Sequence, residues 1–301
     1  MSDPTSQEKA IAKVLLQRHR AYLRGGREAA FFKALGRFLP FGVRRWLAAR
    51  SAKLGLLLLN DGDIVIDKYL GEFKVHVLPN SSTEREMLAG VYERAIVDII
   101  RRYVHSGHVC FDIGANVGAL TLPMCRRAEP GGQVFCFEPG EKFFKRLLSN
   151  LALNSSIASV ARPQMLGFSD SPARMNWAED TAFPGNAWLL GETGVAVDVV
   201  TVDGFVEAHG IKRIDFMKID VEGMEIEVLL GARATLARFR PVIVFESLLE
   251  FEAIRNRAIR KEVEDLLLGL GYEILGIADS GPQLPARYPS LPANCLALPI
   301  S

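Results

Sequence analysis

The sequence predicts an α/β protein built on a doubly wound, mostly parallel, seven-stranded sheet with a terminal antiparallel hairpin, preceded by a basic helical N-terminal segment. From about residue 108 onward, short apolar runs alternate with amphipathic helical patterns, as parallel strands joined by helices require. The runs VCFDI and VIVFE are almost continuously apolar, which is typical of strands covered on both faces. We therefore expect a helical segment over residues 1–60 and a Rossmann-like domain over residues 61–301.

Basic residues are concentrated at the N-terminus. Residues 1–55 contain twelve Lys or Arg and three Asp or Glu, although the whole chain has a formal net charge of +1. Apolar residues recur at helical spacing between these arginines, which predicts two or three short basic amphipathic helices. Two interpretations stay open: a helical cap whose apolar faces pack on the main domain, and peripheral attachment of residues 1–55 to an anionic membrane or an acidic partner.

The remaining elements follow in order along the chain. Alternating apolar residues predict a small antiparallel pair over residues 61–78, and TEREMLAGVYERAIVDIIRRYV predicts one helix over residues 83–104. A hairpin-like stretch is expected over residues 188–202. Strands of the main sheet are expected at 108–114, 133–139, 159–170, 214–220, 241–247, 272–277 and 293–299, with helices at 118–128, 141–154, 224–238 and 260–271.

The cysteines and histidines of the sequence indicate no metal site. The four cysteines form no C-x-x-C pair, three of them lie in apolar patterns, and the five histidines have no partner pattern, so we expect reduced core thiols and no zinc. The N-terminus lacks a secretion-signal pattern, and no stretch supplies about 18 uncharged apolar residues. A cytoplasmic location is therefore expected.

A strand runs directly into a glycine-containing turn at VCFDIGANVGALT. Asn116, between Gly114 and Gly118, occupies the position of the second glycine in the dinucleotide fingerprint, where a pyrophosphate approaches the backbone. An asparagine there disfavours a diphosphate ligand. Asp112 precedes the turn at the carboxyl end of the strand, where its negative charge favours a cationic ligand. S-adenosylmethionine carries a sulfonium and an ammonium group, and we expect all four residues to bind it.

Glu138 ends the next strand in the sequence FEP and is followed by Pro139. It comes about 24 residues after Gly114, near the spacing at which an acidic residue binds a ribose diol. We expect Glu138 and Pro139 to contact the same cofactor. A structural alternative stays open for each part of the turn, because the glycines also permit tight strand–helix packing and Asp112 can cap the helix.

The motifs of the chain resemble those of a known family. DIGANVGALT, FEPGEKFFKRLLSNLALN, the KIDVEG-x-E-x-x-VL-x-GA block and PVIVFE are similar to successive motifs of the FkbM-type methyltransferases, a branch of the class I S-adenosylmethionine enzymes. The resemblance covers about residues 91–299. It implies a Rossmann-like methyltransferase domain, S-adenosylmethionine as cofactor, and a small-molecule or glycan acceptor.

The resemblance also implies further site residues. Glu93 matches the acidic residue of the family's Tyr-Glu step before the first strand. Ser169 and Asp170 match a Ser-Asp step after the third strand, and residues 201–203 match a Thr-x-Asp step. Ala119 departs from the pattern, because many relatives carry an aromatic residue there, which is expected to widen the pocket near the methionine tail.

Three carboxylates are candidate bases for methyl transfer. Asp220 and Glu222 lie in KIDVEG, and Glu246 ends the apolar strand VIVFES, so all three follow strands at the expected ligand edge. For Glu222, an acidic first turn of the following helix is an equal alternative. Lys218 shares a strand face with Asp220, which favours a structural ion pair. The three carboxylates could also accept magnesium, but nothing in their spacing demands it, so magnesium is not favoured and no metal ligand is assigned.

Two other classes of function are alternatives to a methyltransferase acting on a hydroxyl group. A nicotinamide-dependent oxidoreductase shares the predicted sheet, although Asn116 and Asp112 disfavour it. A non-catalytic binding module would be recruited through the basic N-terminal helices. A nucleic-acid partner is not expected, because the basic residues are confined to one segment without an aromatic-rich stacking surface. The stretch WAEDTAFPGNAW is expected to form a lid that selects the acceptor.

Overall fold

The computed structural model of the protein describes residues 64–78, 82–90, 92–179, 187–188, 194–278 and 284–300. The basic helices predicted over residues 1–60, and with them the membrane contact of residues 1–55, lie outside the described residues. The chain divides into two compact units, and the boundary between them falls between Tyr92 and Glu93. In the part of the chain that the structure describes, no helix is long and apolar enough to cross a membrane.

The smaller unit contains the predicted antiparallel pair. Strand β1 (Ile64–Tyr69) pairs with β2 (Phe73–Val77), and the turn between them places Leu70 and Gly71 at positive φ. Helix α5 (Ser82–Ala89) follows, and its buried Glu84 accepts a hydrogen bond from the backbone N–H of Leu78. The predicted helix over 83–104 is wrong as a single element, because the chain turns at Gly90 (φ 74°) before α6 (Arg94–Tyr103) begins.

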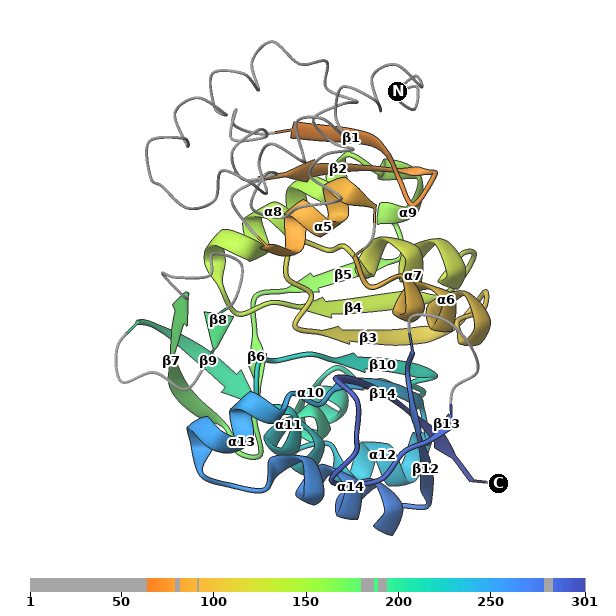
Figure 1. Ribbon diagram of the computed structural model, residues 1–301. Helices are drawn as coiled ribbons and strands as arrows, with labels where there is room; N and C mark the ends of the chain where they lie inside the picture. The colour runs from red at the N-terminus through yellow and green to blue at the C-terminus, as the bar shows by residue number, and fades with distance from the viewer. Residues whose placement is uncertain are drawn as a thin grey trace, which may run out of the picture. The chain divides into compact units, whose positions relative to one another are not determined.

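The larger unit is built on a mixed sheet (Figure 1). Its strand order is β13-β12-β14-β11-β10-β3-β4-β5, with five parallel strands from β11 to β5 and an antiparallel β12/β14 hairpin at the other end. Seven strands lie at predicted positions, together with the two-residue β13, but the stretch expected as one strand over residues 159–170 is divided between β5 of this sheet and a short strand of a second sheet. The strands are β3 (Val109–Ile113), β4 (Gln133–Phe137), β5 (Ala161–Gln164), β10 (Phe216–Ile219), β11 (Val242–Glu246), β12 (Tyr272–Gly276), β13 (Leu284–Pro285) and β14 (Asn294–Pro299).

Helices cover the sheet as the alternating pattern predicts. One continuous core holds phenylalanines from β3, β4, β6 (Gly167–Phe168) and α10, together with apolar residues of α11, α12 and α14. Within it the Phe137 ring lies 4.7 Å from that of Phe168 and 5.0 Å from that of Phe205, both edge-to-face. The helices are α7 (Thr121–Ala128), α8 (Glu141–Ala152), α9 (Ser155–Ala158), α10 (Val202–Ala208), α11 (Glu225–Leu230), α12 (Arg233–Phe239), α13 (Leu249–Arg255) and α14 (Ile259–Gly269).

The helix predicted over residues 224–238 is divided in the structure into α11 and α12. Gly231 separates them, and a Cβ at Gly231 would lie 2.2 Å from the carbonyl oxygen of Ser169. The close approach of this loop therefore requires glycine where the sequence pattern alone continues as a helix.

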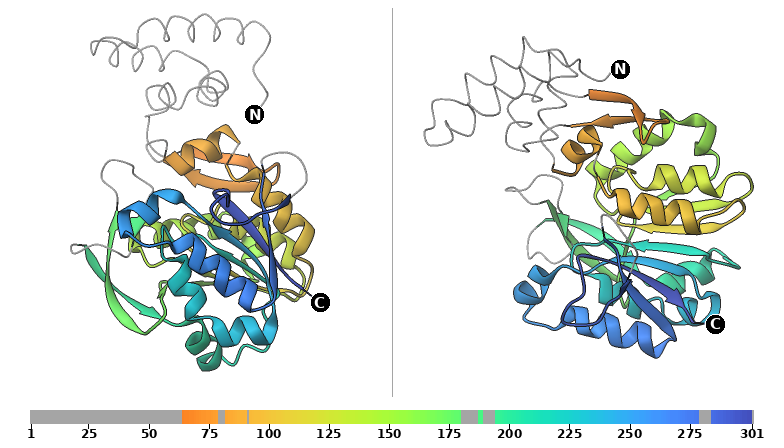
Figure 2. Two further views of the ribbon diagram at one scale, coloured as in Figure 1. Left: turned by 60° about the horizontal axis from the view of Figure 1, so that its bottom comes forward. Right: turned by 45° about the vertical axis from the view of Figure 1, so that its right-hand side comes forward.

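A second sheet, with strand order β6-β9-β7-β8, lies beside the main one. Strand β9 (Val195–Val200) pairs antiparallel with β7 (Ala173–Glu179), which in turn pairs with the two-residue β8 (Ala187–Trp188). The hairpin predicted within 188–202 is therefore wrong, because the partner of β9 is β7, a segment partly assigned to a lid. The β7–β9 ribbon lies on the side toward which β4 and β5 point, and Figure 2 shows it from two further directions.

Candidate active site

Charged residues gather where β3, β10 and β11 lie side by side. In the parallel register Lys218 of β10 is opposite Asp112 of β3, and Asp220 follows the end of β10 directly. Glu246 is the last residue of β11. Because the carboxyl ends of parallel strands meet at one edge, the register places an Asp112–Lys218–Asp220 cluster next to the glycine turn.

Lys218 is the centre of this cluster and is only 4% exposed. Its Nζ lies 3.5 Å from Asp112 Oδ1 and 3.2 Å from Asp220 Oδ2, and it donates a 2.7 Å hydrogen bond to the carbonyl oxygen of Gly114. Burial disfavours the charged form of Lys218, but the carboxylates of Asp220 and Asp112 outweigh it and raise its pKa. The predicted structural ion pair is confirmed.

Asp112 is completely buried, and its charge is compensated within the protein. Its Oδ2 accepts a 2.5 Å hydrogen bond from the hydroxyl of Thr121, and its Oδ1 faces Lys218 without a hydrogen-bond partner. The sequence analysis expects the negative charge of Asp112 to favour a cationic ligand, and in the structure Lys218, which is shared with Asp220, offsets part of that charge. A direct contact between Asp112 and a cofactor stays a prediction.

The glycine turn is shaped by close packing. A Cβ on Gly114 (φ +78°) would lie 1.8 Å from the carbonyl oxygen of Asp220, and one on Gly118 (φ +87°) would lie 2.7 Å from Leu147 Cδ1. Asn116 is also left-handed, with φ 50°. The structural alternative for the glycines is thus present in the fold, because both positions require glycine without any ligand.

The turn's backbone N–H groups are largely used within the protein. Those of Gly114 and Ala115 donate to the carbonyl oxygen of Phe137, and that of Gly118 donates to the carbonyl oxygen of Ala115. The N–H of Asn116 donates to Glu138 Oε2 at 3.0 Å. A phosphate-binding loop needs such N–H groups to point at the ligand. This turn offers a diphosphate few of them.

Glu138 follows the end of β4 and is bonded to the backbone on both sides. Besides the bond from Asn116, Oε1 accepts a 2.9 Å hydrogen bond from the N–H of Gly140. Burial raises the pKa of Glu138 to about 7, and the two backbone N–H groups offset part of that rise. A carboxylate accepts about four hydrogen bonds, so each oxygen keeps capacity for a hydroxyl.

The loop after Glu138 packs against the second sheet. A Cβ on Gly140 would lie 2.3 Å from the indole ring of Trp177, and that ring lies edge-to-face with Phe143 at 5.8 Å. Trp177, predicted to belong to the lid, is therefore part of β7 and covers the loop that includes Pro139 and Gly140. Sequence reasoning missed this contact because only the β7–β9 pairing brings Trp177 there.

Ser169 and Asp170 lie just after β6. The N–H of Ser169 donates to the carbonyl oxygen of Val200, and Asp170 Oδ1 accepts hydrogen bonds from the hydroxyls of Ser169 (3.4 Å) and Ser171 (3.1 Å). Their side chains thus bond to one another. A cofactor contact for Ser169 and Asp170 stays a prediction.

Glu246 has a buried carboxylate oxygen with no partner among the described residues. Its Oε2 makes no hydrogen bond, although it is shielded from solvent. Burial, followed by the negative charges of Asp220, Glu222 and Glu225, raises the pKa of Glu246 well above its ordinary value, while Lys218 lowers it. An uncompensated buried oxygen at a strand end is a feature of functional rather than structural carboxylates.

Glu93 lies near Glu246 through the terminal hairpin. Asn294 of β14 pairs with Glu246 in the antiparallel register, and its Nδ2 donates a 3.3 Å hydrogen bond to Glu93 Oε2. Glu93 itself has φ 43° and precedes α6. The sequence analysis did not identify Asn294 as a site residue. A signal was available, because Asn294 is a polar residue at the start of the apolar strand in ANCLALP. The predicted cofactor contact of Glu93 is not tested by this geometry.

Glu222 lies in the loop before α11, and Glu225 is the first residue of that helix. Oε1 of Glu225 accepts hydrogen bonds from the N–H groups of Val221 (3.1 Å) and Gly223 (3.3 Å), so Glu225 closes the loop. The alternative that Glu222 supplies the acidic first turn is therefore wrong, because Glu225 has that position. Sequence reasoning missed Glu225, although the acidic residue two positions after Gly223 in VEGME was a signal. In the described part of the chain, no three His, Cys, Asp or Glu residues form a group that could hold a metal ion.

Glu222 should make the stability of the protein pH-dependent. Burial, followed by the charges of Asp220 and Glu225, raises its pKa to about 8 from an ordinary value of 4.5. The unfolded chain loses this proton first, so stability falls as the pH rises from about 4.5 to 8. We expect Glu222→Gln to be more stable than the wild type by about 1–3 kcal/mol at pH 8 and equal to it at pH 4.5, allowing for solvent screening.

Thermal and urea denaturation at the two pH values measure this difference. The matched control is Glu273→Gln, because Glu273 is exposed on β12 and should change stability by less than about 0.5 kcal/mol at either pH. Equal stability of Glu222→Gln and the wild type at pH 8 would show that Glu222 is solvated in the folded protein.

Comparison with known proteins identifies the domain. The family model for the methyltransferase FkbM domain matches residues 112–274, more than half of the chain. The hexuronic acid methyltransferase AglP of Haloferax volcanii is 23% identical over 203 residues, covering 67% of this chain and 79% of the relative. The 31-O-demethyl-FK506 methyltransferase FkbM of Streptomyces tacrolimicus is 28% identical over 241 residues, covering 67% and 90%.

A solved structure gives a weaker likeness. The crystal structure of a methyltransferase FkbM from Methylobacillus flagellatus KT is 14% identical, with a TM-score of 0.42, and the match covers 90% of this chain and 59% of that one. The family match itself extends from Asp112 at the glycine turn to Ile274 of β12, and thus includes Glu138, Asp220 and Glu246. The chain belongs to the FkbM methyltransferase family and is an enzyme of that class.

Proposed function

We propose that the protein is an S-adenosylmethionine-dependent O-methyltransferase that acts on a hydroxyl group of a small molecule or a saccharide. The observation that carries the proposal is the buried, unpartnered Oε2 of Glu246 at the carboxyl edge of the sheet. The names of two relatives support the acceptor class, because one is a hexuronic acid methyltransferase and the other acts on 31-O-demethyl-FK506.

The residues present fit S-adenosylmethionine better than a dinucleotide. Four of the turn's N–H groups already donate hydrogen bonds within the protein, so few donors are left there for the phosphate oxygens of a dinucleotide. Glu138 keeps acceptor capacity for a ribose diol at the end of β4. When bound, S-adenosylmethionine supplies an electrophilic methyl group on a good leaving group. The chain's task is to orient the acceptor and to remove its proton.

Glu246 is the residue best suited to take that proton. Its raised pKa makes it a stronger base than an ordinary carboxylate, and its free Oε2 can accept a hydrogen bond from a hydroxyl without breaking one inside the protein. Asp220 is held by Lys218 at 3.2 Å, which fixes its orientation and engages one of its two carboxylate oxygens. Glu246 is therefore proposed as the base, with Asp220 and Glu222 setting the electrostatic field around it.

Methylation of a defined acceptor tests the proposed function. The purified full-length protein would be incubated with methyl-labelled S-adenosylmethionine and a panel of hydroxylated small molecules and uronic acid-containing saccharides. We expect the label in an ether-linked methyl group, located by mass spectrometry, on at least one acceptor. Label on a carboxylate, nitrogen or carbon atom would contradict O-methylation. Tight binding of nicotinamide dinucleotides with no binding of S-adenosylmethionine would contradict the cofactor.

Glu138→Gln should weaken cofactor binding. An amide accepts fewer hydrogen bonds than a carboxylate. Its NH₂ group would also face a backbone N–H group that now donates to Glu138, so two donors would meet without an acceptor. We expect S-adenosylhomocysteine to bind about 10- to 100-fold more weakly, as measured by calorimetry, since charge-assisted bonds contribute about 1.5–3 kcal/mol. Glu141→Gln is the matched control, because Glu141 is exposed and pairs only with Lys145. If Glu138→Gln bound S-adenosylhomocysteine as tightly as the wild type, Glu138 would not be a cofactor-binding residue.

A further inference from the structure

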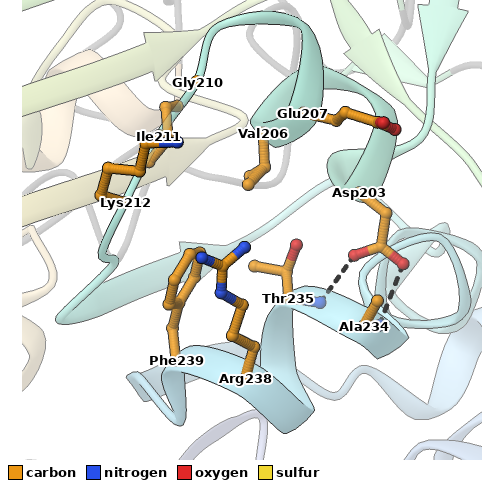
Figure 3. A pocket seen from close by; sticks show the side chains of 10 residues that line it. All are labelled: Asp203, Val206, Glu207, Gly210, Ile211, Lys212, Ala234, Thr235, Arg238 and Phe239. Atoms are coloured by element: carbon orange, nitrogen blue, oxygen red, sulfur yellow. Dashed lines mark hydrogen bonds between the residues drawn. The ribbon is translucent and has the colours of Figure 1, made fainter.

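A cavity lies at the opposite edge of the main sheet from Glu246. It has a volume of about 350 Å³ and lies between α10 and α12. Residues 210–212 border it just before β10 begins, and Arg238 and Phe239 border it just before β11 begins (Figure 3). The cavity is therefore at the amino ends of these two strands, whereas the candidate active site is at their carboxyl ends. No role proposed above uses it.

The joint between α10 and α12 is fixed by a carboxylate. Asp203 accepts hydrogen bonds from the N–H groups of Ala234 (3.0 Å) and Thr235 (2.8 Å), the first turn of α12, and its own N–H donates to the carbonyl oxygen of Gly231. Figure 3 shows both bonds at the right-hand end of the cavity. The charge of Asp203 is thus offset by backbone dipoles, and the cavity wall is preformed.

Two polar side chains of α12 point into this cavity and have no hydrogen-bond or ion-pair partner among the described residues. Thr235 is only 3% exposed, yet its hydroxyl makes no hydrogen bond to any described residue, and Figure 3 shows it directed toward Val206. The guanidinium of Arg238 points the same way and stacks on the ring of Phe239 at 4.8 Å. Among the described residues no carboxylate pairs with Arg238, and the carboxylate of Glu207 points away from it.

We propose that this cavity binds a small molecule with an oxyanion on an apolar body, such as an aromatic carboxylate or phosphate ester. A guanidinium stacked on an aromatic ring is suited to a carboxylate or phosphate, and the hydroxyl of Thr235, which faces the cavity, supplies a second donor. Val206, Ile211 and Phe239 form apolar walls for the rest of the ligand. A volume near 350 Å³ lies within the range of small-molecule sites.

Calorimetry on the full-length protein with four simple probes tests this site. The probes are benzoate, phenyl phosphate, inorganic phosphate and benzyl alcohol, each titrated in the presence of saturating S-adenosylhomocysteine. We expect benzoate or phenyl phosphate to bind saturably, with an affinity at least ten-fold higher than that of inorganic phosphate or benzyl alcohol. Whichever of benzoate and phenyl phosphate binds more tightly shows whether the site prefers a carboxylate or a phosphate. Absence of binding by both, or binding that appears only without S-adenosylhomocysteine, would overturn the proposal.

Two substitutions locate the binding. Arg238→Gln and the isosteric Thr235→Val should each lower the affinity for the tighter-binding probe about ten-fold. This is the size expected for the loss of one charge-assisted hydrogen bond or of one hydroxyl donor. Arg233→Gln, an exposed arginine at the start of the same helix, is the matched control and should not change affinity. Circular dichroism tests whether Thr235→Val is folded. If it is not, the result for the surface variant Arg238→Gln alone tests the proposal. Unaltered binding in Arg238→Gln would refute the site.

Discussion

Replacement of Glu246 by glutamine is expected to lower kcat for methyl transfer by about 100- to 10,000-fold, the range that general-base catalysis contributes. The amide keeps the shape of the side chain but cannot take a proton from the acceptor hydroxyl. Affinity for S-adenosylhomocysteine should change less than two-fold, because Glu246 lies on β11, with β10 and β3 between it and the Glu138 strand. Labelled methyl transfer and calorimetry on the same preparation measure both quantities.

The pH profile separates a base from a merely structural carboxylate. Because burial and neighbouring carboxylates raise the pKa of Glu246, kcat of the wild type should rise with pH beyond the range where an ordinary glutamate ionises. Glu246→Gln should lose this rise. Glu250→Gln, an exposed glutamate on α13, is the matched control and should retain both rate and profile. A Glu246→Gln enzyme with wild-type kcat would assign the base to another group.

Replacement of Lys218 by methionine is expected to destabilise the fold by about 3–5 kcal/mol, the cost of leaving a buried charge uncompensated. Asp112 is completely buried, and its Oδ1 has no other charged partner in the ion pairs that the structure describes. Methionine fills a similar volume, so the loss comes from charge and from the bond to the Gly114 carbonyl oxygen. Urea denaturation at pH 8 measures the effect.

The control for Lys218→Met is Lys145→Met. Lys145 forms an exposed ion pair with Glu141, and exposed pairs contribute little to stability, so this variant should unfold at nearly the same urea concentration as the wild type. A loss below about 1 kcal/mol for Lys218→Met at pH 8 would show that solvent reaches Asp112 in the folded protein.

The features that depend on local pattern could be predicted from the sequence. Strand alternation places Lys218 and Asp220 on one face, and apolar runs separated by helical periods give the parallel sheet. Glu246 could be assigned to a strand end because an apolar run stops there. The ion pair between Lys218 and Asp112 needs one further step, the parallel register of β10 on β3, which the alternating order implies.

The features that depend on register between distant segments could not be predicted. Trp177 reaches Gly140 only because β7 pairs with β9, and Asn294 reaches Glu93 only through the antiparallel register of β14. Local pattern also failed at Gly231, where a close backbone contact interrupts an otherwise helical stretch.

The central strand pair joins residues that are far apart along the chain. The N–H of Val109 at the start of β3 bonds to Asp215, 106 positions later, and β10 supplies Lys218 to the carbonyl oxygen of Gly114. During synthesis on a ribosome, the glycine turn therefore cannot acquire its final neighbours until the strand ending at Ile219 has emerged. Until then Asp112 lacks its counter-ion, and the backbone N–H of Val109 lacks the carboxylate that accepts its hydrogen bond.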